Sequence, residues 1–87
     1  MAAHVEIYSK ATCPYCIRAK RLLDALDIAY DDIDINLHPE RRDEMIQRAQ
    51  GRMTVPQIFI DGKHVGGSDD LFRLESSGEL ERMLSGE

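Results

Sequence analysis

The sequence is poor in the features that define several large classes of protein. Its 87 residues include only two cysteines, which excludes a framework of several disulfides. Its apolar runs are far shorter than the 18 or so residues that a membrane-spanning helix needs. No internal repeat, low-complexity tract or linker is visible along the chain. We therefore expect a single domain over residues 1–87 that has no membrane partner.

Basic residues are also scarce. The chain has 11 lysines and arginines against 16 acidic residues, a net charge of −5, and this argues against nucleic-acid binding because phosphate contacts need a basic surface. The acids concentrate in residues 31–34 and 69–87, while several bases surround the cysteines: Lys10, Arg18, Lys20 and Arg21. That end of an acidic protein is suited to a small anionic partner. Alternatively, the bases after the cysteines only form the solvated face of a helix.

The first residues, 1–6, have neither the basic nor the apolar region of a signal peptide. We therefore expect a cytoplasmic protein. In that reducing compartment paired thiols are more often catalytic than structural.

Both cysteines lie in one short segment, Cys13-Pro14-Tyr15-Cys16. Proline is favoured at the first position of a helix, which puts Cys13 at the helix start, where unpaired backbone N–H groups and the helix dipole stabilise a thiolate. Together with Lys10, this should lower the pKa of Cys13 into the range of roughly 3.5–7.5 that such motifs reach. Cys16 lies one turn further along and should be less exposed. The spacing predicts that Cys13 attacks and Cys16 resolves.

Two structural roles for the cysteines are weaker alternatives. A disulfide closing a loop of about 4 residues would contribute only roughly 2 kcal/mol. A structural zinc site needs four ligands, and the only other soft candidates, His4, His38 and His64, lack the spacing of such sites. Each histidine is expected at the surface or at a sheet edge. A redox-active dithiol is favoured.

Apolar periodicity predicts the order βαβαββα followed by a short last helix. The first strand, helix and second strand (4–8, 14–27 and 30–35) form a βαβ unit with parallel strands. A second helix begins at Pro39 and ends before Gly51. Asp61-Gly62 predicts a hairpin between strands 57–60 and 63–66. The third helix is expected to be capped by Ser68 or Asp69 and to end near residue 77, before a short helix that carries Leu80, Met83 and Leu84.

Three segments in this order resemble the glutaredoxin family, specifically its short bacterial dithiol type, the glutaredoxin three subfamily. They are Cys13-Pro14-Tyr15-Cys16, Thr54-Val55-Pro56 and Gly66-Gly67-Ser68-Asp69-Asp70. The resemblance implies an α/β thioredoxin fold, a four-stranded mixed sheet flanked by helices. It also implies a cis peptide bond before Pro56 and a glutathione molecule bound across the three segments.

The resemblance further implies the contacts with glutathione. The backbone of Val55, between Thr54 and Pro56, would pair with the cysteinyl part of the ligand as a short β-strand addition. A basic side chain of the second helix would join Lys10 and Tyr15 at the glycyl carboxylate: Arg42, with Arg41 and Arg52 as alternatives. Gly67 would allow close approach. The N–H groups around Ser68 and Asp69 would hold the γ-glutamyl carboxylate, and Asp70 or Asp69 its ammonium group.

By the same resemblance the protein is a glutathione-disulfide oxidoreductase and a monomer, with glutathione as co-substrate and no metal. Its substrates would be glutathionylated or disulfide-bearing proteins, and a separate glutathione reductase would recycle oxidised glutathione. Ser68 stands where relatives often carry a cysteine, so a second disulfide through that position is excluded. Two other functions stay open: an iron–sulfur cluster carrier, as in monothiol relatives, and a redoxin reduced by thioredoxin reductase.

Overall fold

The computed structural model describes residues 3–85. Its centre is a four-stranded sheet in the order β2-β1-β3-β4. β1 pairs parallel with β2 and antiparallel with β3, and β3 pairs antiparallel with β4. The strand bounds are β1 (Val5–Ser9), β2 (Asp31–Asp34), β3 (Gln57–Ile60) and β4 (Lys63–Gly66). The mixed sheet and the parallel first pair agree with the sequence prediction.

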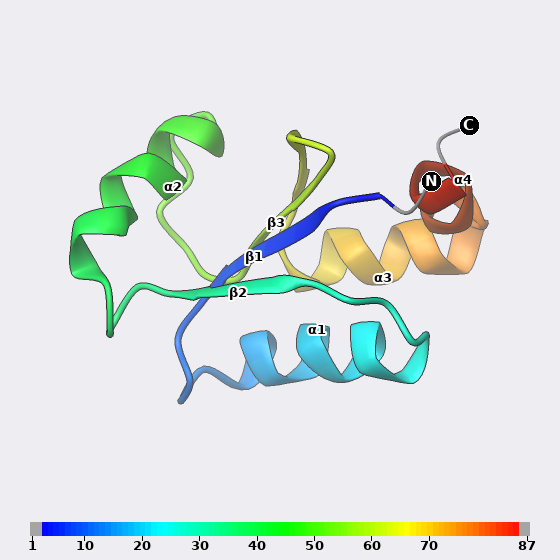
Figure 1. The fold of residues 1–87 in the computed structure, drawn as a ribbon, viewed down its shortest axis with the longest axis horizontal. Coiled ribbons are helices and arrows are strands. Elements are labelled where there is room, and N and C mark those ends of the chain that lie inside the picture. The colour runs from blue at the N-terminus through cyan, green and yellow to red at the C-terminus, as the bar shows by residue number, and fades with distance from the viewer. Residues whose placement is uncertain (1–2, 86–87) are drawn as a thin grey trace.

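The helices lie on both faces of this sheet (Figure 1). α1 and α3 run side by side along one face, and α2 covers the other. The bounds are α1 (Pro14–Ala25), a 3-10 turn η1 (Pro39–Arg41), α2 (Arg42–Arg48), α3 (Ser68–Ser77) and α4 (Glu79–Ser85). Within residues 3–85, no helix is both long and apolar enough to cross a membrane.

The alternation of side chains along β1 divides the core into two clusters, because successive strand residues face opposite sides of a sheet. Val5 and Ile7 are buried towards α1 and α3, where they pack in the same cluster as Leu23 and Leu71. Tyr8 points to the other face and packs in the cluster that contains Met45 of α2. Both faces of the sheet are thus closed by apolar packing.

A polar network lies beneath α2. Both guanidinium Nη atoms of Arg48 donate to the carboxylate of Glu6, at 3.0 and 2.9 Å, and Nη1 also donates to the Tyr8 hydroxyl at 2.8 Å. The Tyr8 hydroxyl donates in turn to Glu44. The network ties α2 to β1 through charged side chains that are partly buried.

Element ends differ from the sequence prediction by one or two residues. α1 ends at Ala25 rather than near Asp27, because Asp27 has a positive φ of 60° that a helix cannot continue. The second helical segment opens as the 3-10 turn η1 before α2 begins. The expected cap of α3 was wrong. Gly67 is the N-cap residue, and Asp70 supplies the side chain that accepts its N–H.

Candidate active site

Cys13 is the N-cap residue of α1, and Pro14 follows it in the first turn, as the sequence predicted. The Cys13 side chain is partly exposed, whereas Cys16 has a relative exposure of 0%. Both thiols are free. The Cys13 sulfur lies 3.9 Å from the carbonyl oxygen of Val55. The accessible thiol therefore sits against the loop that precedes β3, and the buried thiol sits behind it.

The surroundings shift the pKa values of the two thiols in opposite directions. Burial opposes ionisation of Cys13, but hydrogen bonds from the backbone and thiol of Cys16 and from the backbone of Tyr15, together with the charge of Lys10, outweigh it and lower the pKa of Cys13. Burial is also the main influence on Cys16, and with the neighbouring Cys13 it raises the pKa of Cys16 to about 11. Since the thiolate is the nucleophile, Cys13 is the thiol equipped to attack.

The loop before β3 is fixed from behind by Gln57. The amide Nε2 of this buried residue donates to the backbone carbonyl of Thr54 at 2.9 Å, and its Oε1 lies 2.7 Å from His64 Nε2 on β4. The peptide bond between Val55 and Pro56 is cis, as the resemblance implied. The loop that faces Cys13 is thus held by the sheet itself.

The start of α3 forms the opposite wall. Gly66 has a φ of 122°, a conformation that L side chains rarely adopt, and a Cβ there would collide with the carboxyl group of Asp70. Asp70 Oδ2 accepts the N–H of Gly67 at 2.9 Å and lies 3.3 Å from Nη1 of Arg52. These contacts lower the pKa of Asp70, chiefly through the Gly67 hydrogen bond, and keep it ionised. A fixed carboxylate and a guanidinium therefore stand beside a helix N-terminus.

A groove of about 440 Å³ runs between these walls. It contains Tyr15 from the cysteine segment, the whole Thr54-Val55-Pro56 loop and the start of α3. Its lining is Tyr15, Arg52, Thr54, Val55, Pro56, Gly67, Ser68, Asp69, Asp70 and Arg73. We call it the glycine–proline groove. Three segments far apart in the sequence therefore form one concave surface beside Cys13.

Comparison with known proteins assigns the family. A family model described as Glutaredoxin matches residues 5–65. Glutaredoxin 3 of Escherichia coli K12 is 51% identical over 82 residues, which cover 94% of this chain and 98% of that protein. Glutaredoxin 1 of Rickettsia prowazekii is 52% identical over 81 residues, 92% of this chain and 85% of that protein. The chain belongs to the glutaredoxin family.

Solved glutaredoxins share the fold. The solution structure of a glutaredoxin from Brucella melitensis superposes with a TM-score of 0.81 at 48% identity, covering 95% of this chain and 89% of that one. A buckwheat glutaredoxin solved as a complex with glutathione gives a TM-score of 0.88 at 33% identity, covering 97% and 78%. The thioredoxin fold is thereby confirmed. As a glutaredoxin, the chain is a glutathione-dependent thiol-disulfide oxidoreductase.

Two residues expected at the ligand, Arg42 and Lys10, are not among the residues that line this groove. Arg42 is exposed on α2 and is not among the residues that line the glycine–proline groove, whereas its alternative Arg52 is. Lys10 is partly buried in the turn before Cys13 and also lies outside the groove lining. The charge of Lys10 favours the Cys13 thiolate.

The histidines stand apart from the thiols. His4 and His38 are exposed and pair with Asp31 and Glu40, respectively. His64 lies on the edge strand β4 and is partly buried against Phe59. Across residues 3–85, no group of three or more histidine, cysteine or acidic side chains is arranged to hold a metal ion.

Sequence reasoning missed Gln57, Arg73 and the state of Ser68. In the sequence Gln57 has the pattern of an ordinary strand residue. Its contacts with Thr54 and with His64 of β4 appear only in the folded β3–β4 hairpin. Arg73 lies one turn after Asp70 on α3, and that spacing could have indicated it. Ser68 is buried and lines the groove, and within the described residues its hydroxyl has no hydrogen-bond partner.

Proposed function

We propose that this protein reduces glutathione mixed disulfides and protein disulfides, with Cys13 as nucleophile and Cys16 as resolving thiol. The observation that carries the proposal is the position of the Cys13 sulfur, 3.9 Å from the Val55 carbonyl at the wall of the glycine–proline groove. A disulfide bound along that wall has one sulfur within reach of the thiolate.

On a glutathionylated protein, the Cys13 thiolate attacks the sulfur of glutathione. The bond between glutathione and the protein breaks, and the protein thiolate leaves and takes a proton from water. Cys13 now carries glutathione. A second glutathione thiolate attacks this disulfide, releases Cys13 and forms oxidised glutathione. The lowered pKa of Cys13 assists both steps, because it favours the attacking thiolate and also makes Cys13 a better leaving group.

On a protein disulfide, Cys13 forms a mixed disulfide with one target sulfur while the other leaves as a thiolate. Cys16 then loses its proton and attacks Cys13, and the target leaves fully reduced. The buried position and raised pKa of Cys16 keep it protonated until this step. The product is an oxidised Cys13–Cys16 pair, which two glutathione molecules reduce.

Glutathione occupies the glycine–proline groove in this proposal. The backbone of Val55 pairs with the cysteinyl part of the ligand. The start of α3 around Ser68 offers N–H groups to the γ-glutamyl carboxylate, and Asp70 attracts the ammonium group. Arg52 replaces Arg42 of our sequence expectation as the cation for a carboxylate of the ligand, since Arg52 lines the groove and Arg42 does not.

The setting proposed for this activity is a reducing compartment such as the cytoplasm, with the protein working as a monomer. A glutathione reductase recycles the oxidised glutathione and is an indirect partner only. Cys13 is partly exposed, whereas Cys16 is fully buried. Exchange with partners therefore passes through Cys13.

The test is a coupled assay on a small glutathione mixed disulfide. NADPH oxidation is followed with glutathione and glutathione reductase, and in a second arm with thioredoxin reductase alone. Activity confined to the first arm supports the proposal. Equal turnover in the second arm would identify a redoxin reduced by thioredoxin reductase and would overturn it.

A further inference from the structure

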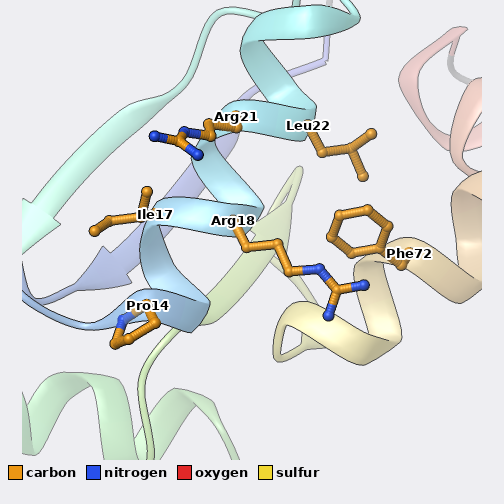
Figure 2. A pocket seen from close by; sticks show the side chains of 6 residues that line it. All are labelled: Pro14, Ile17, Arg18, Arg21, Leu22 and Phe72. Atoms are coloured by element: carbon orange, nitrogen blue, oxygen red, sulfur yellow. The ribbon is translucent and has the colours of Figure 1, made fainter.

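A second groove opens on the other side of the cysteine segment (Figure 2). Its volume is about 560 Å³, and its lining is Pro14, Ile17, Arg18, Arg21, Leu22 and Phe72. All of these except Phe72 of α3 belong to α1. We call it the α1–α3 groove. Pro14 follows Cys13 directly in the chain, so the groove begins beside the attacking thiol.

Four of the six residues that line this groove are apolar. Ile17 is 38% exposed although it is a large aliphatic residue, and Leu22 and Phe72 are partly buried. In Figure 2 Leu22 and Phe72 face each other across the gap between α1 and α3. The guanidinium of Arg18 lies over the Phe72 ring, 4.2 Å from its centroid. An aliphatic side chain from a partner would gain contact area here.

Arg18 and Asp69 separate the two grooves. Arg18 Nη1 lies 3.9 Å from Asp69 Oδ1. Arg18 lines the α1–α3 groove and Asp69 lines the glycine–proline groove. A mixed disulfide between glutathione and a protein also has two halves that meet at one S–S bond. If glutathione binds in the glycine–proline groove, the α1–α3 groove on the other side of Arg18 and Asp69 is free to bind the protein half.

The charge of the α1–α3 groove opposes that of the whole molecule. The chain carries a net charge of −5, yet Arg18 and Arg21 line this groove and no acidic residue does. Among the residues that the structure describes, Arg21 makes no salt bridge. A cation without a carboxylate partner, at the edge of an apolar surface, complements a segment that carries both carboxylates and an aliphatic side chain.

We propose that the α1–α3 groove docks the protein half of the substrate and selects targets whose disulfide is flanked by an aliphatic and an acidic residue. This inference rests on the proposed function and adds the substrate class to it. The aliphatic side chain packs against Ile17, and the carboxylate meets Arg21, which projects from the same side of α1 as Ile17 in Figure 2. Glutathione binding in the other groove is unaffected.

Two glutathionylated peptides test this. Each has leucine next to the modified cysteine, and one has glutamates where the other has lysines. The wild type should show a kcat/KM about tenfold higher for the glutamate peptide at low salt, and salt should reduce the preference. Equal rates for the two peptides at low salt would overturn the proposal.

Arg21→Glu is the decisive variant, with Arg82→Glu on the exposed surface of α4 as the matched control. Arg21→Glu should abolish the preference for the glutamate peptide, and Arg82→Glu should retain it. Both should reduce a mixed disulfide between glutathione and a small uncharged thiol at the wild-type rate. If the wild type itself does not reduce that small substrate, the proposed function fails, whatever the two peptides show.

A second variant and a second measurement complete the test. Ile17→Ser should lower kcat/KM for both peptides about threefold to tenfold without changing their ratio, because it removes only apolar contact. Unchanged values would contradict the apolar part of the proposal.

Sedimentation at assay concentration should give a monomer for wild type and Arg21→Glu. A wild-type dimer that Arg21→Glu dissociates would assign the groove to a second copy of the chain and would overturn the proposal.

Discussion

The sulfur of Cys13 and the carbonyl oxygen of Val55 lie 3.9 Å apart, although 42 positions separate the two residues in the chain. The contact joins the start of α1 to the loop before β3, two segments that are held by different parts of the sheet. Because Cys16 is buried immediately behind, only one of the two thiols is presented to the groove. The predictions below depend on this asymmetry.

The first prediction concerns ionisation of Cys13. Hydrogen bonds from the start of α1 and the charge of Lys10 lower its pKa despite burial, so its alkylation rate should reach half its plateau at a lower pH than that of an ordinary cysteine thiol. Iodoacetamide kinetics against pH measure this in the Cys16→Ser protein, where one thiol remains. Lys10→Gln should move the midpoint upwards, and Lys63→Gln on the hairpin should not. A midpoint near 8.5 in the parent would contradict this account of Cys13.

The second prediction concerns Asp70. Asp70→Asn keeps the size of the side chain but removes the charge that pairs with Arg52, 3.3 Å away. The KM for glutathione should rise about tenfold, and the rate of Cys13 alkylation should stay unchanged. Asp43→Asn on the exposed face of α2 is the matched control. An unchanged KM in Asp70→Asn would mean that the ligand does not use this carboxylate.

The third prediction separates two effects of adding a methyl group. Gly62 and Gly66 both have positive φ, but a Cβ meets no atom within 4 Å at Gly62 and collides with the Asp70 carboxyl group at Gly66. Gly62→Ala should therefore cost only the conformational strain of about 1–2 kcal/mol. Gly66→Ala should lose more stability in urea and should also raise the KM for glutathione. Identical losses in the two variants would contradict the close approach at Gly66.

The fourth prediction concerns the network beneath α2. The bidentate hydrogen bonds from Arg48 lower the pKa of Glu6. Stability from such a group is present above the carboxyl's unfolded pKa and is lost as the pH falls through its lowered folded pKa. Glu6→Gln should therefore cost about 1–3 kcal/mol at pH 7 and much less near pH 2. Urea unfolding at both pH values measures it, and a constant difference between the proteins would refute the assignment.

Much of the fold follows from local patterns in the sequence. The alternation of Val5 and Ile7, the Asp61-Gly62 turn and Pro14 after Cys13 each determine structure over a few residues, and the structure confirms the element that each predicts. The cap of α3 was not predicted correctly, because Ser68 is the residue type that usually caps a helix. Here its hydroxyl is buried at the groove, and the carboxylate of Asp70 accepts the Gly67 N–H instead.

The cation at the groove illustrates what local patterns do not determine. Arg42 and Arg52 are equivalent as sequence letters near the same helix. Which one faces the groove depends on how α2 ends, with positive φ at Gln50 and Gly51 turning the chain so that Arg52 reaches Asp70. The end of α2 also packs in the core, where Met45 and Ala49 share a cluster with Phe59 of β3, and no short window of sequence contains both partners.

The division of labour between the two thiols is the central claim, and Cys16→Ser tests it most directly. Attack on a glutathionylated substrate releases the target in the first step, so a second glutathione can complete the cycle without Cys16. A protein disulfide leaves the whole target on Cys13, and the neighbouring thiol releases it efficiently because its effective concentration is high.

The measurement is the activity of Cys16→Ser on a glutathionylated peptide and on a protein disulfide, with a non-reducing gel of the second reaction. The account predicts that the first activity persists. The second should fall by about two orders of magnitude, with a covalent adduct of protein and target on the gel. Loss of both activities would make Cys16 necessary for the first attack and would contradict the account.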